Sequence, residues 1–327
     1  MYQVMSYYKF HPIPNPDQFC REHKNKCCFL NLMGRIYVAA EGINGSVAGY
    51  SEEVAEYKKY LSSLPGFEDT QYKEDSCDYI PFDRLKVKTR PELVALKYPV
   101  PIDSQTQGGT HLTPQQWRTA IESEKDFVLL DVRNNYESAV GHFPGAIRPD
   151  IENFFDFPTW LEQADIDKNK KVLMYCTGGI RCEKFSALMR KQGFENVNQL
   201  QGGILNYAAK EGGAHFKGKC FVFDDRLTVP VEPDQKEPVG RCAISGVPCD
   251  TYINCANLNC NSLFICAAEA AIKMEGCCSE ECRKSSWKKP FDPKGIYQPT
   301  RRWHNYYEQV GAQRFLKSAC TAESKEL

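Results

Sequence analysis

Two residues that could act together in a reaction, Cys176 and Arg181, lie near the middle of the chain with four residues between them. The apolar run 172–175 predicts a buried strand, and the residues that follow Arg181 have the spacing of a helix. A cysteine between a strand and a helix faces backbone N–H groups and the positive end of the helix dipole, which favour the thiolate. The thiolate is the nucleophilic form, and an arginine supplies a fixed cation beside it. We therefore predict that Cys176 is a nucleophile, against the alternative of a buried structural cysteine.

The turn between these two residues would direct its backbone N–H groups at the sulfur, and it consists of Thr177, Gly178, Gly179 and Ile180. Cys182 directly follows Arg181 and opens the predicted helix. It could act as a resolving thiol that forms a disulfide with Cys176 or accepts its sulfur. The alternative is a half-buried helix residue without a redox role.

The composition indicates a soluble, cytoplasmic protein of two or three domains. The 327 residues have 41 Lys and Arg against 42 Asp and Glu, so the formal net charge of -1 points neither to nucleic acid nor to a membrane. No apolar run is long enough to cross a bilayer, and the N-terminus lacks the layout of a signal peptide. Many of the 16 cysteines lie close together in the segment 242–282, which favours metal or redox chemistry over a secreted disulfide scaffold.

Residues 1–97 predict a ferredoxin-like α/β domain with the order βαββαβ. The expected strands are 2–10, 35–40, 46–48 and 84–88, and the expected helices are 14–28 and 52–64. Asn44 and Gly45 are a turn signal between the second and third strands. Arg35, Glu41 and Asn44 surround this turn and are candidates for contact with RNA or substrate, the alternative being a tight hairpin without such a role.

Residues 98–112 are rich in proline, glycine and polar side chains, which predicts a linker. The segment 113–217 is predicted to be a separate domain, and it begins with a helix whose cap is Thr113. Apolar strands at 127–130, 172–175 and 197–200 alternate with helical segments. This alternation predicts a mainly parallel sheet with helices on both faces.

In a parallel sheet of this kind, sites lie at the carboxyl ends of the strands, where Asp131 and Cys176 both fall. Asp131 and Arg133 are expected to support the cysteine loop through buried charge-assisted hydrogen bonds. The alternative for this pair is an ion pair of purely structural value at the end of a strand.

Residues 218–327 predict a cysteine-rich region with a basic and aromatic end. The Cys-x2-Cys pairs of a zinc ribbon are absent from its sequence, but a four-sulfur zinc site remains open. Its candidate ligands are Cys255, Cys260, Cys278 and Cys282. The alternatives are structural thiols packed under loops and disulfides formed on oxidation.

The segment 283–302 carries seven Lys and Arg against one acid, with aromatic residues interleaved. Basic groups bind phosphates and aromatic faces stack on unpaired bases, so single-stranded or loop RNA is the expected partner. The predicted RNA contacts here are Lys288, Lys289, Arg301, Arg302 and Trp303. A solvated basic tail is the alternative.

The central segment resembles a rhodanese domain through the motifs LLDVRNNYE, GHFPGAI, CTGGIR and LQGGI. The resemblance implies that Cys176 carries a persulfide, that the loop backbone cradles it and that Arg181 closes the loop. The Cys-x4-Arg spacing is the shorter form suited to sulfur transfer, because phosphatases with a related loop need one more residue to fit a tetrahedral phosphate.

Nearly the whole chain resembles the tRNA uridine hydroxylase family, through GRIYVAAEGINGSVAG, CFVFDDRL, YINCANLNCNSLFIC and CCSEEC. The resemblance implies oxygen-dependent 5-hydroxylation of the wobble uridine of tRNA (position 34), with Cys176 as the residue on which the reaction depends and molecular oxygen as co-substrate. Ser245, Ala267 and Ala270 stand where the family pattern has further cysteines, which argues against bound zinc.

The residues by themselves do not lead to hydroxylation, since the sequence has no flavin or nicotinamide fingerprint and no facial-triad iron motif. Two other functions stay open. One is a sulfurtransferase that passes sulfane sulfur from thiosulfate or another persulfide donor through Cys176. The other is a non-catalytic RNA-binding or redox-sensing module. Nothing in the sequence indicates the oligomeric state.

Overall fold

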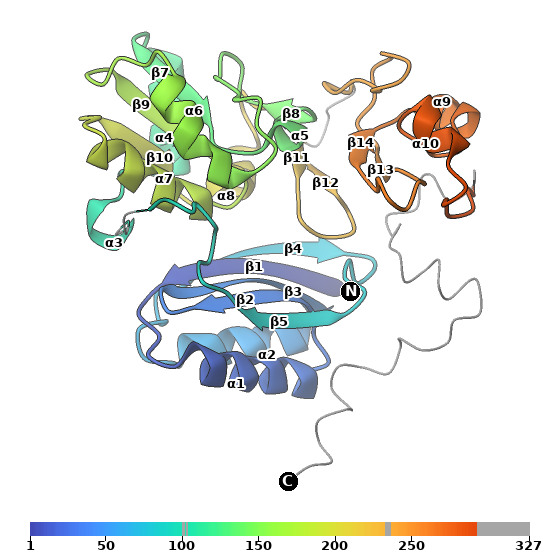
Figure 1. Cartoon of the computed structure of the whole chain (residues 1–327). Coiled ribbons are helices and arrows are strands. Elements are labelled where there is room, and N and C mark those ends of the chain that lie inside the picture. Colours follow the sequence, from blue (N-terminus) through green and yellow to red (C-terminus); the bar gives the residue numbers. More distant parts are fainter. Residues whose placement is uncertain (100–101, 103, 233–236, 293–327) are drawn as a thin grey trace.

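The computed structural model describes residues 1–99, 102, 104–232 and 237–292. These residues form an N-terminal domain, a central domain and a small C-terminal region (Figure 1). The N-terminal sheet carries its helices on the face that points away from the rest of the molecule, and it turns its other face toward the central domain. None of the helices in this described part of the chain has the length and apolar character that a bilayer-crossing segment needs.

The N-terminal domain is a five-stranded sheet in the order β4-β1-β3-β2-β5. Its elements are β1 (Tyr2–Phe10), α1 (Pro16–Phe29), β2 (Met33–Ala39), β3 (Gly42–Tyr50), α2 (Ser51–Ser62), β4 (Gln71–Cys77) and β5 (Leu85–Thr89). Alternate residues of β1, such as Met5 and Tyr7, pack with Val54 and Tyr57 of α2 in the domain core. The first four strands and two helices have the ferredoxin-like order, so the predicted domain type is confirmed.

Two details of the N-terminal prediction are wrong. Residues 84–88 are not the last ferredoxin-like strand, because β4 takes that place and β5 is an additional strand parallel to β2. The polar sequence of β4, QYKEDSC, has no apolar alternation that would reveal it. Asn44 and Gly45 do not form the turn either: they lie inside β3, and the chain turns at Ala40 and Glu41.

The central domain has a parallel four-stranded sheet in the order β6-β10-β9-β7. Its strands are β6 (Thr110–Leu112), β7 (Phe127–Asp131), β9 (Lys171–Tyr175) and β10 (Val197–Leu200). The helices α4 (Pro114–Ser123) and α8 (Gly203–Glu211) pack in one core cluster, and α6 (Phe157–Gln163) and α7 (Ile180–Lys191) pack in another. The predicted parallel sheet with helices on both faces is therefore confirmed.

The ends of the linker prediction need correction. Residues 104–107 form the short helix α3 (Ser104–Gln107), and β6 is an edge strand of the central sheet, although both lie in the segment predicted as a linker. A three-residue strand that contains His111 has no apolar run to signal it. The predicted cap of α4 is confirmed, since the backbone N–H of Gln116 donates to Thr113 Oγ1 at 3.2 Å.

Short elements connect the central domain to the C-terminal region. They are α5 (Asn135–Ser138), β8 (Gly141–His142), η1 (Phe154–Asp156), β11 (Lys217–Phe221) and β12 (Thr228–Pro230). β11 pairs with β8 on one side and β12 on the other, which joins the two parts. Beyond them come the antiparallel pair β13 (Tyr252–Asn254) and β14 (Leu263–Ile265) and the helices α9 (Ala268–Lys273) and α10 (Glu280–Lys284).

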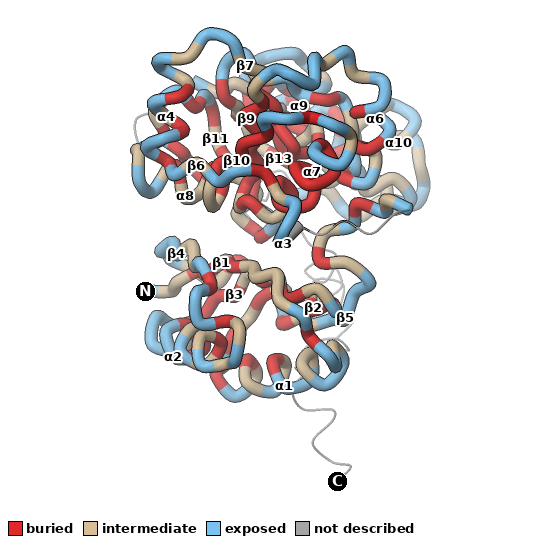
Figure 2. Tube along the Cα trace, turned by 90° about the vertical axis from the view of Figure 1, so that its left-hand side faces the viewer, coloured by how far each residue is buried: buried red, intermediate tan, exposed pale blue. Residues whose placement is uncertain are grey.

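The helix α7 is buried over most of its length, which Figure 2 shows as an almost continuous red tube. Every residue from Arg181 to Met189 is buried, including the charged residues Glu183 and Lys184. One face of α7 packs on the central sheet through Phe185 and Leu188. The charged residues contact the N-terminal domain, so this helix forms the junction between the two domains.

Candidate functional site

Cys176 follows the carboxyl end of β9, and only 1% of its surface is exposed. The backbone N–H of Gly179 donates to Cys176 Sγ at 3.1 Å. Gly179 has a φ of +103°, and a Cβ there would lie 2.7 Å from Tyr8 Oη, so only glycine fits. Because α7 begins at Ile180, the positive end of its dipole is adjacent to the sulfur.

The environment of Cys176 favours its thiolate. Burial opposes ionisation, but a hydrogen bond from Cys182, the charge of Arg181 and backbone N–H groups outweigh it and lower the pKa of Cys176 to about 5. Burial, together with the neighbouring Cys176, raises the pKa of Cys182 well above its usual value. Cys176 therefore ionises first and Cys182 stays a thiol. Cys182 is fully buried, whereas the alternative to a redox role had assumed a half-buried helix residue.

Arg181 is held by a partner that sequence reasoning did not assign a role, the buried carboxylate of Glu137. Arg181 donates to both carboxylate oxygens of Glu137, at 2.5 and 2.7 Å. Thr177 Oγ1 lies 3.3 Å from Glu137 Oε2 and completes the contact with the loop. A buried arginine requires a counter-charge, which is the signal that could have found Glu137.

Asp131 and Arg133 form a second ion pair with both side chains fully buried. Arg133 Nε and Nη2 donate to the two Asp131 oxygens at 2.8 and 2.6 Å. Arg133 also donates to the carbonyl oxygens of Gly141, at 2.6 Å, and Glu137, at 3.4 Å. The pair thus fixes the backbone that carries Glu137, and it reaches the cysteine loop through that residue.

The LQGGI motif explains how the far side of the loop is held. At the start of α8, the backbone N–H of Ile204 donates to the carbonyl oxygen of Cys176 at 3.0 Å, and that of Leu205 donates to Thr177 at 3.1 Å. A Cβ on Gly203 would lie 2.5 Å from the Cys176 carbonyl oxygen, so this close approach requires glycine.

The N-terminal sheet covers the cysteine loop from the other side. Tyr8 Oη donates to Glu183 Oε1 of α7 at 2.8 Å. Lys184 Nζ of α7 lies 2.8 Å from Glu41 and 2.7 Å from Glu92. Glu41, a predicted contact for RNA or substrate, therefore forms an ion pair across the junction between the two domains. The N-terminal domain therefore packs against the cysteine loop, a contact that sequence reasoning did not foresee.

Arg35 and Asn44 lie on the sheet face that is turned to the central domain. Asn44 is directly opposite Tyr8 in the β1–β3 ladder, and Arg35 is opposite Ser46 in the β2–β3 ladder. Directly opposed residues point to the same side of a sheet. Both predicted RNA contacts therefore share the face that carries Tyr8.

The C-terminal candidates for RNA contact are placed only in part. Lys288 Nζ lies 2.8 Å from Glu275 Oε2, so its charge is paired. The backbone N–H of Lys289 donates to Ala256. Trp287 is 61% exposed beside them. The remaining candidates lie outside the described residues; they are Arg301, Arg302 and Trp303.

The four predicted metal ligands come together in space: the sulfur atoms of Cys255, Cys260, Cys278 and Cys282 all lie within 4.8 Å of one another. Cys278 Sγ is 3.6 Å from Cys260 Sγ and 3.8 Å from Cys282 Sγ. A tetrahedral zinc ion with Zn–S bonds of about 2.3 Å requires sulfurs roughly 3.8 Å apart. The donor set and its spacing therefore fit zinc, although Ser245, Ala267 and Ala270 are not cysteines.

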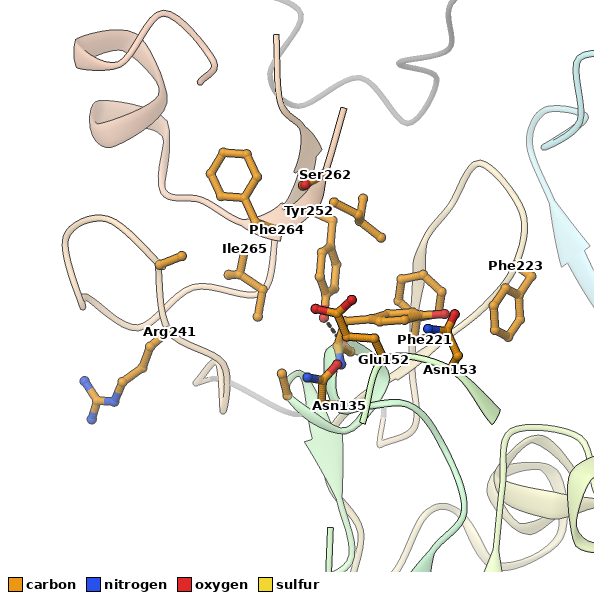
Figure 3. Close-up of a pocket in the computed structure, with 14 residues that line it drawn as sticks. Asn135, Glu152, Asn153, Phe221, Phe223, Arg241, Tyr252, Ser262, Phe264 and Ile265 are labelled. Carbon is orange, nitrogen blue, oxygen red and sulfur yellow. Dashed lines mark hydrogen bonds between the residues drawn. The ribbon is translucent and has the colours of Figure 1, made fainter. Parts of the chain in front are cut away.

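A pocket of about 780 Å³ lies between the central domain and the C-terminal region (Figure 3). Aromatic rings line much of it, from Tyr136, Phe221, Phe223, Tyr252 and Phe264. Phe223 is 50% exposed, and its ring centroid lies 5.8 Å from the Arg181 guanidinium. The aromatic pocket is therefore next to the cysteine loop.

The fold and the cysteine loop define a protein with a rhodanese-like catalytic domain. Residues 113–210 match the rhodanese-like domain, residues 2–93 match the UPF0176 acylphosphatase like domain, and residues 217–283 match the Rhodanase C-terminal model.

Relatives named tRNA uridine(34) hydroxylase match along most of the chain. The Chlamydia abortus protein is 41% identical over 93% of this chain and 93% of its own length. The Cytophaga hutchinsonii protein is 40% identical over 94% of this chain and 98% of its own, and the Bacillus licheniformis protein 44% over 86% and 88%. The chain belongs to the tRNA uridine(34) hydroxylase family, as the sequence motifs predicted.

Proposed function

We propose that this protein is an enzyme that hydroxylates uridine 34 of tRNA at C5, with molecular oxygen as co-substrate and Cys176 as the essential reactive residue. The observation that carries the proposal is the 41% identity, over 93% of the chain, to a protein named for this activity, combined with an intact cysteine loop. In the loop, Cys176 supplies the anionic sulfur and Arg181, held by Glu137, fixes the loop around it.

Cys176 is only 1% exposed and Tyr8 lies over its loop, so this part of the N-terminal sheet would have to move before the substrate base could reach the sulfur. The wobble base is unpaired in free tRNA, so inserting it costs less than flipping a paired base. Arg35 and Asn44 are the proposed RNA contacts on the sheet face, which both residues share with Tyr8.

The aromatic pocket offers stacking surfaces for nucleotides next to the wobble base. Base–aromatic stacking is worth about 1–3 kcal/mol per base, and the exposed ring of Phe223 is available at the rim. Lys288, Lys289, Arg301, Arg302 and Trp303 are the proposed contacts farther along the RNA. Phe223→Ala is expected to raise the KM for tRNA with little change in the pKa of Cys176.

Nucleoside mass spectrometry of tRNA tests the proposal. A deletion strain is expected to lack 5-hydroxyuridine and its derivatives at the wobble position. The wild-type gene should restore them, and the Cys176→Ser gene should not. Unchanged nucleoside levels in the deletion strain would contradict the proposal.

The second candidate function is sulfur transfer, and the low pKa of Cys176 favours it. The Cys176 thiolate would attack the sulfane sulfur of thiosulfate, the S–S bond would break, and sulfite would leave. The resulting persulfide would pass its outer sulfur to cyanide or another thiol and regenerate the thiolate. Efficient turnover of thiosulfate and cyanide without RNA would support this function.

We also propose that the four-cysteine cluster, Cys255, Cys260, Cys278 and Cys282, binds a zinc ion with a structural role. Four protein sulfurs leave no open position for a substrate, so the ion would stabilise the small C-terminal region and take no part in the reaction. Backbone and side-chain N–H groups already point at these sulfurs, from Cys278 to Cys255 at 3.5 Å and from Asn257 to Cys282 at 3.3 Å.

A further inference from the structure

Arg181 is the cation of the central domain that acts on the Cys176 thiolate, but Arg181 also pairs with a buried carboxylate. Arg181 is paired with Glu137, and Arg133 is paired with Asp131. Both ion pairs are buried and each carries no net charge. A further cation would add to the stability of an anionic sulfur with 1% exposure, since water is largely excluded.

The N-terminal sheet brings a lysine to this place. Lys73 lies in β4 directly opposite Ser6 of β1, two residues from Tyr8. Its Nζ lies 4.8 Å from the centre of the Tyr8 ring, so the side chain extends along the sheet face toward the cysteine loop. The Tyr8 hydroxyl in turn lies 2.7 Å from where a Cβ of Gly179 would sit, and Gly179 is the residue that donates to the sulfur.

The charges that act on Lys73 belong to Cys176 of the loop and Glu183 of α7, and its ammonium group lies over the ring of Tyr8 of β1. Burial lowers the pKa of Lys73 to about 8, while the charges of Cys176 and Glu183 act in the opposite direction. Within the described residues Lys73 forms no ion pair.

Glu183 is already hydrogen-bonded by other groups. It accepts from Tyr8 at 2.8 Å and from Gln199 at 3.1 Å, and His111 Nε2 lies 2.9 Å from it. The charge of Lys73 acts on both Cys176 and Glu183, and its interaction with Cys176 is the larger of the two.

We propose that Lys73 is the cation that stabilises the anionic sulfur of Cys176, and that Tyr8 positions it by contacting both the ammonium group and the loop. The reaction site is then composite: the central domain supplies the nucleophile and the N-terminal sheet supplies its counter-charge. Lys73 affects the reaction indirectly, through the ionisation of Cys176.

The test is the titration of Cys176, followed as the ultraviolet absorbance of its thiolate, with Cys176→Ser in the same background as the reference. Lys73→Gln is expected to raise the pKa of Cys176 by about one unit, a tenfold change in the ionisation constant, whereas Lys73→Arg should leave it near that of the wild type. Lys58→Gln is the matched control, since Lys58 is a more exposed lysine of the same domain that pairs with Glu74. A Lys73→Gln protein that titrates like the wild type would overturn the proposal.

A reciprocal measurement keeps the test decisive if Lys73→Gln does not fold. Coupling between two ionisable groups is equal in both directions, so removal of the thiolate must lower the pKa of Lys73. Cys176→Ser is close to isosteric, and nuclear magnetic resonance of labelled lysine side chains can follow Lys73 in it. The same pKa of Lys73 in the wild type and in Cys176→Ser would refute the inference. Neither measurement uses tRNA, so this inference and the proposed hydroxylation can fail separately.

Discussion

The cysteine loop and the four-cysteine cluster use the same side chain in opposite settings. Cys176 is a single sulfur, and backbone N–H groups, Arg181 and a neighbouring thiol lower its pKa to about 5. In the cluster, four sulfurs lie within 4.8 Å of one another. Four thiolates at that distance repel one another strongly, so their common ionised form requires a dication. The comparison teaches that the source of positive charge decides whether a cysteine is a nucleophile or a metal ligand.

The sharpest test of the comparison is to remove the nucleophile alone. Cys176→Ser is expected to lower hydroxylation of tRNA by about a thousandfold or more, because a hydroxyl does not ionise in this loop. Cys220→Ser is the matched control: Cys220 is also fully buried, but burial raises the pKa of its thiol to about 12. Activity of Cys176→Ser within tenfold of the wild type would remove the loop from the mechanism.

The charge balance of the loop can be broken at Glu137. Glu137→Gln leaves Arg181 buried without a carboxylate, and we expect a loss of about 3–5 kcal/mol in the free energy of unfolding, measured with urea. Glu124→Gln is the control, because Glu124 pairs with Lys171 at the surface and its loss should cost less than about 1 kcal/mol. Similar losses of unfolding free energy in the two variants would show that the buried pair stabilises the fold no more than the surface pair does.

Metal analysis addresses the other side of the comparison. The purified protein is expected to contain about one zinc ion per chain, and Cys278→Ser should reduce this to less than about a tenth. Cys266→Ser, in a neighbouring part of the same region, should retain the metal. The hydroxylation activity of Cys278→Ser should fall only as far as its folded fraction does. Zinc-free protein with full thermal stability would count against a metal site.

The smallest effect concerns pH. The pKa of Cys176 is about 5 against an ordinary value of 9.0. Its alkylation rate should therefore stay constant at neutral pH and fall only when the pH drops through about 5. Folding lowers this pKa, so ionisation also stabilises the folded state, an effect present above pH 9 and lost as the pH falls toward 5. A midpoint near 9 would place Cys176 among the ordinary thiols.

Local patterns predicted most of the fold. The apolar runs before Asp131 and Cys176 form β7 and β9, and the Thr113 cap starts α4. The errors fall where the local signal is weak. β4 is polar because its outward face is exposed, and β6 is too short to show a period. Asn44 and Gly45 resemble a turn, but pairing on both sides holds them in the middle strand of the sheet.

The sequence by itself determined the cysteine loop, because Cys176, the turn and Arg181 are neighbours along the chain and a strand followed by a helix fixes their geometry. It also identified the four cysteines of the cluster as candidates. Only the tertiary structure decided the charges at the loop. Glu137 reaches it from another element of the central domain, and Tyr8 and the proposed counter-ion Lys73 belong to another domain. Electrostatic interactions depend on distance in space and on exclusion of water, and neither is visible in the order of residues.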